Sequence, residues 1–203
     1  DNNHDSLLLP RPFIKKQWAN WAIRTQNKEV IRTGTRFKYV CLSSAHFESH
    51  LLREIENANG TVLRENVTGL HIENGTKLLH LSNGDGLKIK NVYDSRPPLV
   101  SEGAMYQHFV GLNIQTHDPI FDDSTAILMD FRVPQSSGIH FIYVLPFSKY
   151  SALVESTVYS TEILPKSWYK HQICNYIEQN FPKTTFDIIG EETGALPLNN
   201  KYP

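Results

Sequence analysis

The chain of 203 residues is 40% hydrophobic and 11% aromatic, which is typical of a globular protein with a buried core and excludes a disordered or collagen-like chain. Its 20 basic and 21 acidic residues give a formal net charge of -1. A charge so close to zero produces no field that would gather nucleic acid. The two cysteines lie far apart in the sequence without a C-x-x-C spacing, which argues against a zinc site and against a disulfide framework. This cysteine usage is typical of a protein in a reducing compartment.

The first readable pattern suits either a short amphipathic turn or an edge strand. It covers residues 15–25 (KKQWANWAIRT). A clearer pattern follows and predicts a helix at about residues 44–58. A Ser-Ser pair that can cap free backbone amides precedes this helix, and an Asn-Gly pair ends it. Between them, apolar residues recur at helical spacing: Phe47, Leu51, Ile55 and Ala58.

Residues 61–95 predict a strand, a β-meander and a further strand, because short apolar stretches alternate there with Asn-Gly and Gly-x-Gly turns. Pro97 and Pro98 then interrupt the pattern, since proline cannot donate a hydrogen bond to a sheet. We therefore predict a domain boundary at this point, which divides the chain into residues 1–96 and 97–203.

Four strand-length runs in the second half predict an antiparallel sheet. These runs are residues 106–116, 124–133, 138–147 and 151–160. A helix at about residues 166–180 and a last strand at residues 184–192 complete the predicted elements.

One carboxylate lies in the middle of the fourth run, SALVESTVYS. Successive side chains of a strand point to opposite faces, so Glu155 shares a face with Leu153, Thr157 and Tyr159. One interpretation is a solvated or salt-bridged strand glutamate. The alternative is a carboxyl group in an apolar pocket, where desolvation raises its pKa and makes it a proton donor. The spacing alone does not distinguish the two.

The second and third runs contain further candidates. Phe141 and Tyr143 share one face of the third run, and Asp130 and Arg132 share a face of the second. These residues suit an ordinary core and an ordinary ion pair. The alternative is the lining of a cavity with aromatic walls.

No metal or dinucleotide site is expected from the sequence. His46 and His50 lie one helical turn apart, but the pattern lacks the glutamate of a metalloprotease and a third ligand. Gly84 and Gly86 begin a G-x-G without the third glycine or the strand-to-helix context of a dinucleotide fingerprint.

Several segments together resemble the flavin-dependent lycopene β-cyclases, in particular those of carotenoid-making Bacteroidetes. They are SRPP, FVGLNIQT, ILMDFRVPQ, FIYVLPFSKYSALVESTVYS and EETGALPL, in the order and spacing of that family. The resemblance implies an α+β fold of the flavoprotein hydroxylase type. It implies part of an FAD-binding domain in residues 1–96 and a substrate domain with an antiparallel sheet in residues 97–203. Because the family's N-terminal dinucleotide fingerprint is missing, the sequence is similar to a central fragment.

The resemblance also implies a reaction, in which the acyclic ends of lycopene or another acyclic carotene are protonated and close to β-ionone rings without net redox change. It implies Glu155 as the general acid and Asp130 as a second carboxyl group that positions the acid or takes up the proton. Reduced FAD, with NADPH as reductant, is the implied cofactor, and Asp94 and Arg96 are its implied contacts. Many relatives carry a second acidic residue directly after the strand glutamate, where this chain has Ser156. The implied substrate-binding residues are Phe109, Phe141, Tyr143 and Tyr159.

Other functions remain open at this point. One is a flavin-dependent monooxygenase or prenyl reductase of the same superfamily, and another is a carotenoid-binding fragment without catalysis. A fragment without the fingerprint is expected to be inactive by itself. A C40 hydrocarbon dissolves in bilayers, so we expect a cytoplasmic protein in peripheral contact with the inner face of a bacterial membrane. We expect no nucleic acid and no metal as partners.

Overall fold

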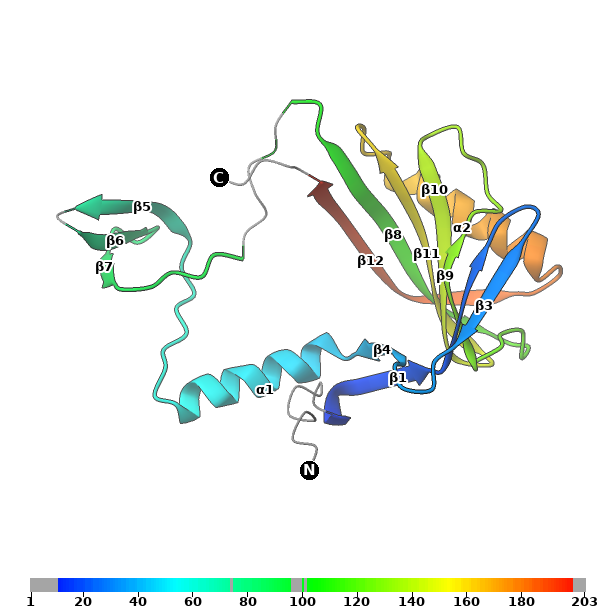
Figure 1. The fold of residues 1–203 in the computed structure, drawn as a ribbon, viewed down its shortest axis with the longest axis horizontal. Helices are drawn as coiled ribbons and strands as arrows, with labels where there is room; N and C mark the ends of the chain where they lie inside the picture. Colours follow the sequence, from blue (N-terminus) through cyan, green and yellow to red (C-terminus); the bar gives the residue numbers. More distant parts are fainter. Residues whose placement is uncertain (1–10, 74, 96–99, 101, 199–203) are drawn as a thin grey trace. The chain divides into compact units, whose positions relative to one another are not determined.

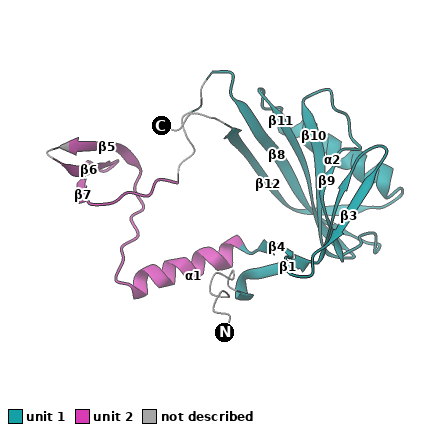
Figure 2. Cartoon of the chain, viewed as in Figure 1, with its two compact units in different colours: residues 1–43, 97–203 teal, residues 44–96 magenta. Residues whose placement is uncertain are grey.

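The computed structural model describes residues 11–73, 75–95, 100 and 102–198. The chain divides into two compact units, which Figure 2 shows in different colours. We call residues 1–43 with 97–203 the sheet unit and residues 44–96 the meander unit.

The sheet unit is built on a seven-stranded sheet with the order β12-β8-β11-β10-β9-β2-β3 (Figure 1). All neighbouring strands of this sheet are antiparallel except β2 and β9, which are parallel. The strands are β2 (Asn20–Arg24), β3 (Glu29–Thr33), β8 (Met105–Thr116), β9 (Thr125–Asp130), β10 (Ile139–Ser148), β11 (Ser151–Ser160) and β12 (Phe186–Leu198).

Helix α2 (Lys166–Asn180) covers one face of this sheet (Figure 1). Tyr169, Ile173 and Ile177 of the helix are buried against every second residue of the central strands, as the alternation of side chains in a strand requires. Burial of this apolar surface, worth roughly 25 cal/mol per Å², is the main force that holds the helix on the sheet. The strand residues of this core are Val110, Leu112, Ile114, Ile142, Val144, Ala152, Val154 and Val158.

A small two-stranded sheet of β1 (Ile14–Trp18) and β4 (Tyr39–Leu42) packs on the opposite face. The 3-10 turn η2 (Arg11–Phe13) precedes it. Trp18 is buried in a cluster with leucines of β10 and β11, and its indole Nε1 donates a 3.0 Å hydrogen bond to the carbonyl oxygen of Pro146. This indole anchors the small sheet over β10 and β11.

The described residues of the meander unit form one helix and three antiparallel strands. Gly75 lies in the turn between β5 and β6 with φ of 76°, a conformation that suits glycine. Its elements are α1 (Ser44–Asn57), β5 (Val67–Glu73), β6 (Thr76–Leu81) and β7 (Gly86–Ile89).

Most of the predicted elements are confirmed. Both helices, the meander and the four strand runs of the second half are present, with ends shifted by a few residues, and the fold is α+β. The prediction of a strand at residues 61–66 was wrong, because this stretch has no partner strand. Residues 14–33 contain three strands, and β2 is an interior strand of the large sheet rather than an edge strand.

The compact units differ from the predicted division in one respect. Residues 1–43 group with the second half of the chain because β2 pairs with β9. The assignment of flavin binding to residues 1–96 and of substrate binding to residues 97–203 stays a prediction. Within the described residues, no helix is long and apolar enough to cross a membrane, and no cluster of three metal-ligating side chains is found.

Candidate active site

One row of residues crosses four neighbouring strands on the face opposite α2. Tyr143 of β10 pairs with Glu155 of β11, Glu155 pairs with Gly111 of β8, and Gly111 pairs with Glu192 of β12. Residues directly opposite each other in antiparallel strands point to the same face. The row therefore brings two carboxyl groups and a phenol onto one strip of the sheet.

Glu155 is half-buried within this row. Burial and the nearby carboxyl group of Glu192 both disfavour the ionised form of Glu155, whereas a hydrogen bond from Thr157 favours it. Burial is the largest of these effects, and the pKa of Glu155 is raised to about 7. The hydroxyl of Thr157 donates this bond to Oε1 at 2.7 Å. A carboxyl group with such a pKa still holds its proton in a large fraction of molecules at neutral pH.

Gly111 leaves the space in which Glu155 and Glu192 meet. A Cβ atom at position 111 would lie 2.9 Å from Cγ of Glu192 and 2.9 Å from Cδ1 of Leu153, closer than packed side chains come. Without that atom, the two glutamates come within hydrogen-bonding reach of each other over the glycine. Two carboxyl groups form such a bond only when one of them is protonated.

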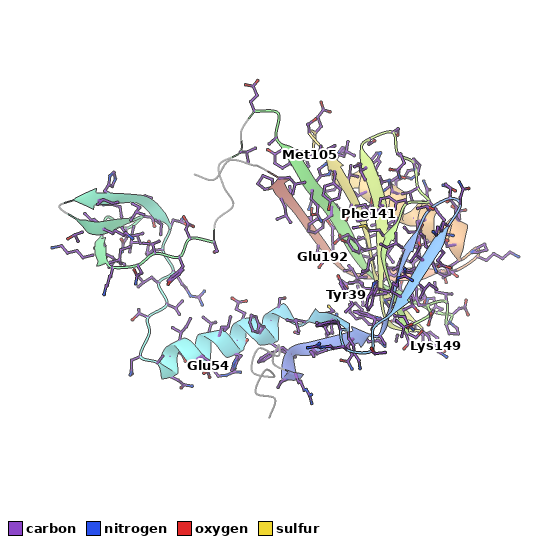
Figure 3. The ribbon with its side chains drawn as sticks, in the orientation of Figure 1. Tyr39, Glu54, Met105, Phe141, Lys149 and Glu192 are labelled. Carbon is purple, nitrogen blue, oxygen red and sulfur yellow. The ribbon has the colours of Figure 1, made fainter. Side chains whose placement is uncertain are left out.

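Glu192 was not found by sequence reasoning. The run FDIIGEETG indicates a strand, but the residue that faces Glu155 depends on the register of β12 against β8, which the sequence does not reveal. The register shifts between Ile188 and Gly190, so even a correct strand prediction leaves two candidate glutamates, Glu191 and Glu192. Figure 3 labels Glu192 on β12 together with Phe141 on β10 and Tyr39 on β4.

The four aromatic residues predicted to bind substrate all lie on the face of Glu155. Phe141 pairs with Thr157, and Thr157 pairs with Phe109, so these rings lie in the row next to the glutamates. The ring centroid of Phe141 is 5.3 Å from that of Tyr143 and 5.8 Å from that of Tyr159. The structure thus brings these residues together with Glu155, while their role in binding substrate stays a prediction.

Tyr39 of β4 adds another phenol to this face, and sequence reasoning missed it because the first forty residues lacked a clear pattern. Burial raises the pKa of Tyr39, and the charges of Cys41 and Glu155 raise it further. Burial, together with the neighbouring Tyr39, Tyr159 and Glu155, raises the pKa of Tyr143 to about 12. Both phenols therefore stay protonated at neutral pH.

Asp130 lies on the other face of the sheet, and this placement corrects the expectation that it assists Glu155. It pairs with Ile142, which belongs to the core beneath α2. Its fully buried carboxylate accepts hydrogen bonds from the Arg132 guanidinium at 2.9 and 2.7 Å and from the Tyr176 hydroxyl at 2.8 Å. Burial alone would raise the pKa of Asp130, but these hydrogen bonds outweigh it and lower the pKa. Asp130 therefore forms an ion pair with Arg132, and its hydrogen bond from Tyr176 ties β9 to α2.

Of the two residues expected to contact flavin, one lies in the meander unit and the other lies outside the described residues. Asp94 lies in the meander unit, after β7, in a stretch without regular structure. Arg96 lies outside the described residues. Their contacts with a cofactor stay a prediction.

Most of the chain is similar in fold to proteins of known structure. It is similar to a geranylgeranyl bacteriochlorophyll reductase-like protein from Thermoplasma acidophilum, with a TM-score of 0.65 at 15% identity over 97% of this chain and 54% of that chain. It is also similar to the halogenase PltM, solved in complex with phloroglucinol and FAD, with a TM-score of 0.59 at 9% identity over 89% of this chain and 43% of that chain. At these identities the likeness defines the class of fold.

Sequence similarity then narrows this class to one family. Residues 2–202 match the family described as lycopene cyclase protein, and the chain belongs to the lycopene cyclase family. It is 26% identical over 211 residues to a lycopene beta-cyclase from Pantoea ananas, covering 97% of this chain and 50% of the relative. It is 44% identical over 165 residues to a lycopene beta-cyclase from a Paracoccus species, covering 79% of this chain and 39% of the relative. The chain thus spans about half the length of the curated relatives it matches.

Proposed function

We propose that this chain carries the proton-donating site of a lycopene β-cyclase, which converts the acyclic ends of lycopene to β-ionone rings. The observation that carries the proposal is the half-buried carboxyl group of Glu155, with a pKa of about 7, on a face rich in aromatic rings. Membership of the lycopene cyclase family and the similarity to two lycopene beta-cyclases support the choice of substrate.

Cyclisation of this kind begins when a proton is added to the terminal double bond of the acyclic end. The reaction needs an acid that is still protonated near the pH of the cell. Glu155 meets this need because burial disfavours its carboxylate. Its O–H bond breaks as a new C–H bond forms at the terminal double bond. The resulting cation is attacked by the electron pair of the next double bond, and loss of a proton from the ring then gives the β-ionone end. The hydrogen bond from Thr157 stabilises the carboxylate that remains.

The cationic intermediates need stabilisation without a nucleophile. Aromatic faces such as those of Phe141, Tyr143 and Tyr159 provide it, at about 0.5 to 2 kcal/mol for each well-placed ring. The hydroxyl of Thr157 is not a free nucleophile, because it already donates a hydrogen bond to Glu155. The reaction also requires that water is kept away from the cation, because water would convert it to an alcohol.

We propose reduced FAD, with NADPH as its reductant, as the cofactor of the full-length protein. The support is the similar fold of a halogenase that was solved with FAD. The described residues do not fit the pyrophosphate of FAD by themselves, because neither helix follows a strand through a glycine-rich turn: Ser43 precedes α1, and Pro165 precedes α2.

The location of the protein follows from the proposed substrate. Because lycopene dissolves in the bilayer, we propose a cytoplasmic protein that contacts the inner face of the bacterial membrane peripherally. Flotation of the full-length protein with vesicles of bacterial lipid tests this proposal. Recovery of the protein with the vesicles supports it, and protein that stays at the bottom of the gradient contradicts it.

The test of the activity is product analysis in bacteria that accumulate lycopene. The full-length protein containing this chain is expected to turn red colonies orange, and Glu155→Gln is expected to leave them red while the circular dichroism spectrum of the purified variant is unchanged. A Glu155→Gln variant that forms β-rings at the normal rate would falsify the assignment. Oxygen uptake coupled to NADPH oxidation, or saturation of the polyene, would instead identify the monooxygenase or the reductase.

A further inference from the structure

The two glutamates of the site differ in their access to water. Glu192 is exposed on the edge strand β12, whereas Glu155 is half-buried on the interior strand β11. Their strands are separated by β8, so the two backbones are two strand spacings apart, or about 9.6 Å. Two glutamate side chains bridge such a distance when the position between them has no side chain, and that position is Gly111. The edge of the sheet is thereby connected to the acid through one pair of carboxyl groups.

We propose that Glu192 carries protons between solvent and the carboxyl group of Glu155, across the space that Gly111 leaves open. This inference rests on the proposed role of Glu155 as the proton donor. Glu192 does not contact the reacting double bond in this scheme, so it is a proton-transfer residue that acts through Glu155.

One turnover returns both glutamates of the site to their starting protonation states. Glu155 gives its proton to the substrate and becomes a carboxylate, and the cyclised cation later releases a proton to solvent. Glu192 takes a proton from water at the edge of the sheet and passes it along the shared hydrogen bond to Glu155, which restores the acid. No proton is gained or lost over the turnover, as the isomerisation requires.

The other titratable groups around Glu155 are poorly suited to this task. Tyr143 of β10 and Tyr39 of β4 stay protonated at neutral pH, because burial raises the pKa of both phenols. Burial also raises the pKa of Cys41 on β4, although the charge of Lys15 opposes this rise. Tyr159, which lies on β11 together with Glu155, donates a hydrogen bond to Gln107 of β8, at 3.2 Å. Glu192 is the carboxyl group among the described residues that acts on Glu155.

The chain offers a matched control beside Glu192. Glu191 pairs with Leu112 and so points to the α2 face, where its carboxylate forms ion pairs with Lys166 and Lys170. Glu191→Gln therefore removes the same charge from the same strand without touching the site. Gly111→Ala is a second probe, because its methyl group forces Glu192 away from Glu155 and keeps both charges.

The first measurement is independent of catalysis. Protein labelled with ¹³C at Cδ of glutamate is titrated by NMR, and the signal of Glu155 is assigned by its loss in Glu155→Gln. We expect a midpoint near 7 in the unsubstituted chain. In Glu192→Gln and Gly111→Ala it should fall by on the order of one pH unit, because a like charge no longer opposes ionisation. In Glu191→Gln it should not move. Equal midpoints in Glu192→Gln and Glu191→Gln overturn the proposal.

The second measurement uses the full-length enzyme with lycopene. Glu192→Gln should lower kcat by about tenfold with little change in KM, enlarge the solvent deuterium isotope effect and move the alkaline limb of the pH profile to lower pH. Glu191→Gln should match the unsubstituted enzyme. A shifted NMR midpoint with unchanged kcat and isotope effect also overturns the relay. An active Glu155→Gln variant, by contrast, contradicts the proposed function itself. Failure of the relay through Glu192 and failure of the acid role of Glu155 are therefore distinguishable.

Discussion

The hydroxyl of Ser156, the residue directly after Glu155, lies 2.9 Å from Nε2 of His140 on the face of the sheet opposite the acid. Nδ1 of His140 lies 2.9 Å from the carbonyl oxygen of Pro134, which only accepts hydrogen bonds, so Nδ1 carries the ring hydrogen and Nε2 accepts from Ser156. Both side chains are fully buried. The position after the strand glutamate therefore serves the core beneath α2, and the second carboxyl group near the acid comes from β12 instead.

We expect Ser156→Ala to lower the free energy of unfolding by about 1 to 3 kcal/mol, because it leaves Nε2 of His140 buried without a donor. Urea unfolding followed by circular dichroism measures this change. Ser136→Ala, in an exposed turn, is the control and should differ from the unsubstituted chain by less than about 0.5 kcal/mol. Equal effects of the two substitutions contradict the assigned hydrogen bond.

The same histidine makes stability depend on pH. Burial lowers the pKa of His140, so the unfolded chain binds a proton at this residue before the folded chain does. Its contribution to stability is therefore fully present above the unfolded pKa of about 6.5 and is lost as the pH falls through the lower pKa of the folded state. We expect His140→Gln to be less stable than the unsubstituted chain at pH 7.5 and to lose less stability between pH 7 and pH 5. Parallel pH curves for the two proteins contradict this expectation.

Glu155 is expected to act in the opposite direction. Its pKa is raised to about 7, so the folded chain holds this proton up to a higher pH than the unfolded chain. Stability is then lost as the pH rises from about 4.3 to about 7. Glu155→Gln removes this loss, and we expect the variant to melt at a higher temperature than the unsubstituted chain at pH 8 and at a similar one at pH 4.5. A variant that is less stable than the unsubstituted chain at pH 8 contradicts this expectation, because it shows that the folded chain stabilises the carboxylate of Glu155.

Asp130 should matter for stability and not for proton transfer. We expect Asp130→Asn to lower the free energy of unfolding by about 3 kcal/mol, since it removes the partner of Arg132 and leaves one acceptor fewer for Tyr176. Because the pKa of Asp130 is lowered, this contribution is present above about pH 4 and is lost as the pH falls through the folded pKa. Variant protein that is folded at 20 °C should keep its cyclisation pH profile. A shifted pH profile would show that Asp130 takes part in the reaction.

Trp18 is expected to hold the small sheet of β1 and β4 over the site. Trp18→Ala deletes a fully buried indole and its hydrogen bond to Pro146, and should cost about 3 to 5 kcal/mol. Trp18→Phe keeps part of the packing and should cost less. Hydrogen exchange of the β4 amides provides the local readout, because these amides should exchange faster in Trp18→Ala while those of β11 stay protected. Equal protection of β4 in both proteins contradicts the anchoring role.

The sequence was sufficient for elements whose pattern is local. Helix α2 and strand β11 were predicted from periodicity, and the alternation along β11 placed Glu155 and Tyr159 on one face. Pairing across strands was not accessible in the same way. The face of Asp130 is decided by its pairing with Ile142, which the sequence does not reveal, so Asp130 was wrongly expected near the acid. Glu192 was missed because β12 shifts its register beside β8. The site depends on such non-local pairings, whereas the elements that carry it do not.

The parallel pairing of β2 with β9 also has a consequence for how the chain reaches its native state. Asn20 lies beside Thr125, so the hairpin of β2 and β3 is synthesised long before its neighbour in the sheet. Contacts between such distant segments form late, because the entropy cost of closing the loop comes before the pairing contributes any stability. Until then the β2 edge is unpaired and open to other chains. The seam between β2 and β9 is thus the place where slow folding and aggregation of this protein should begin.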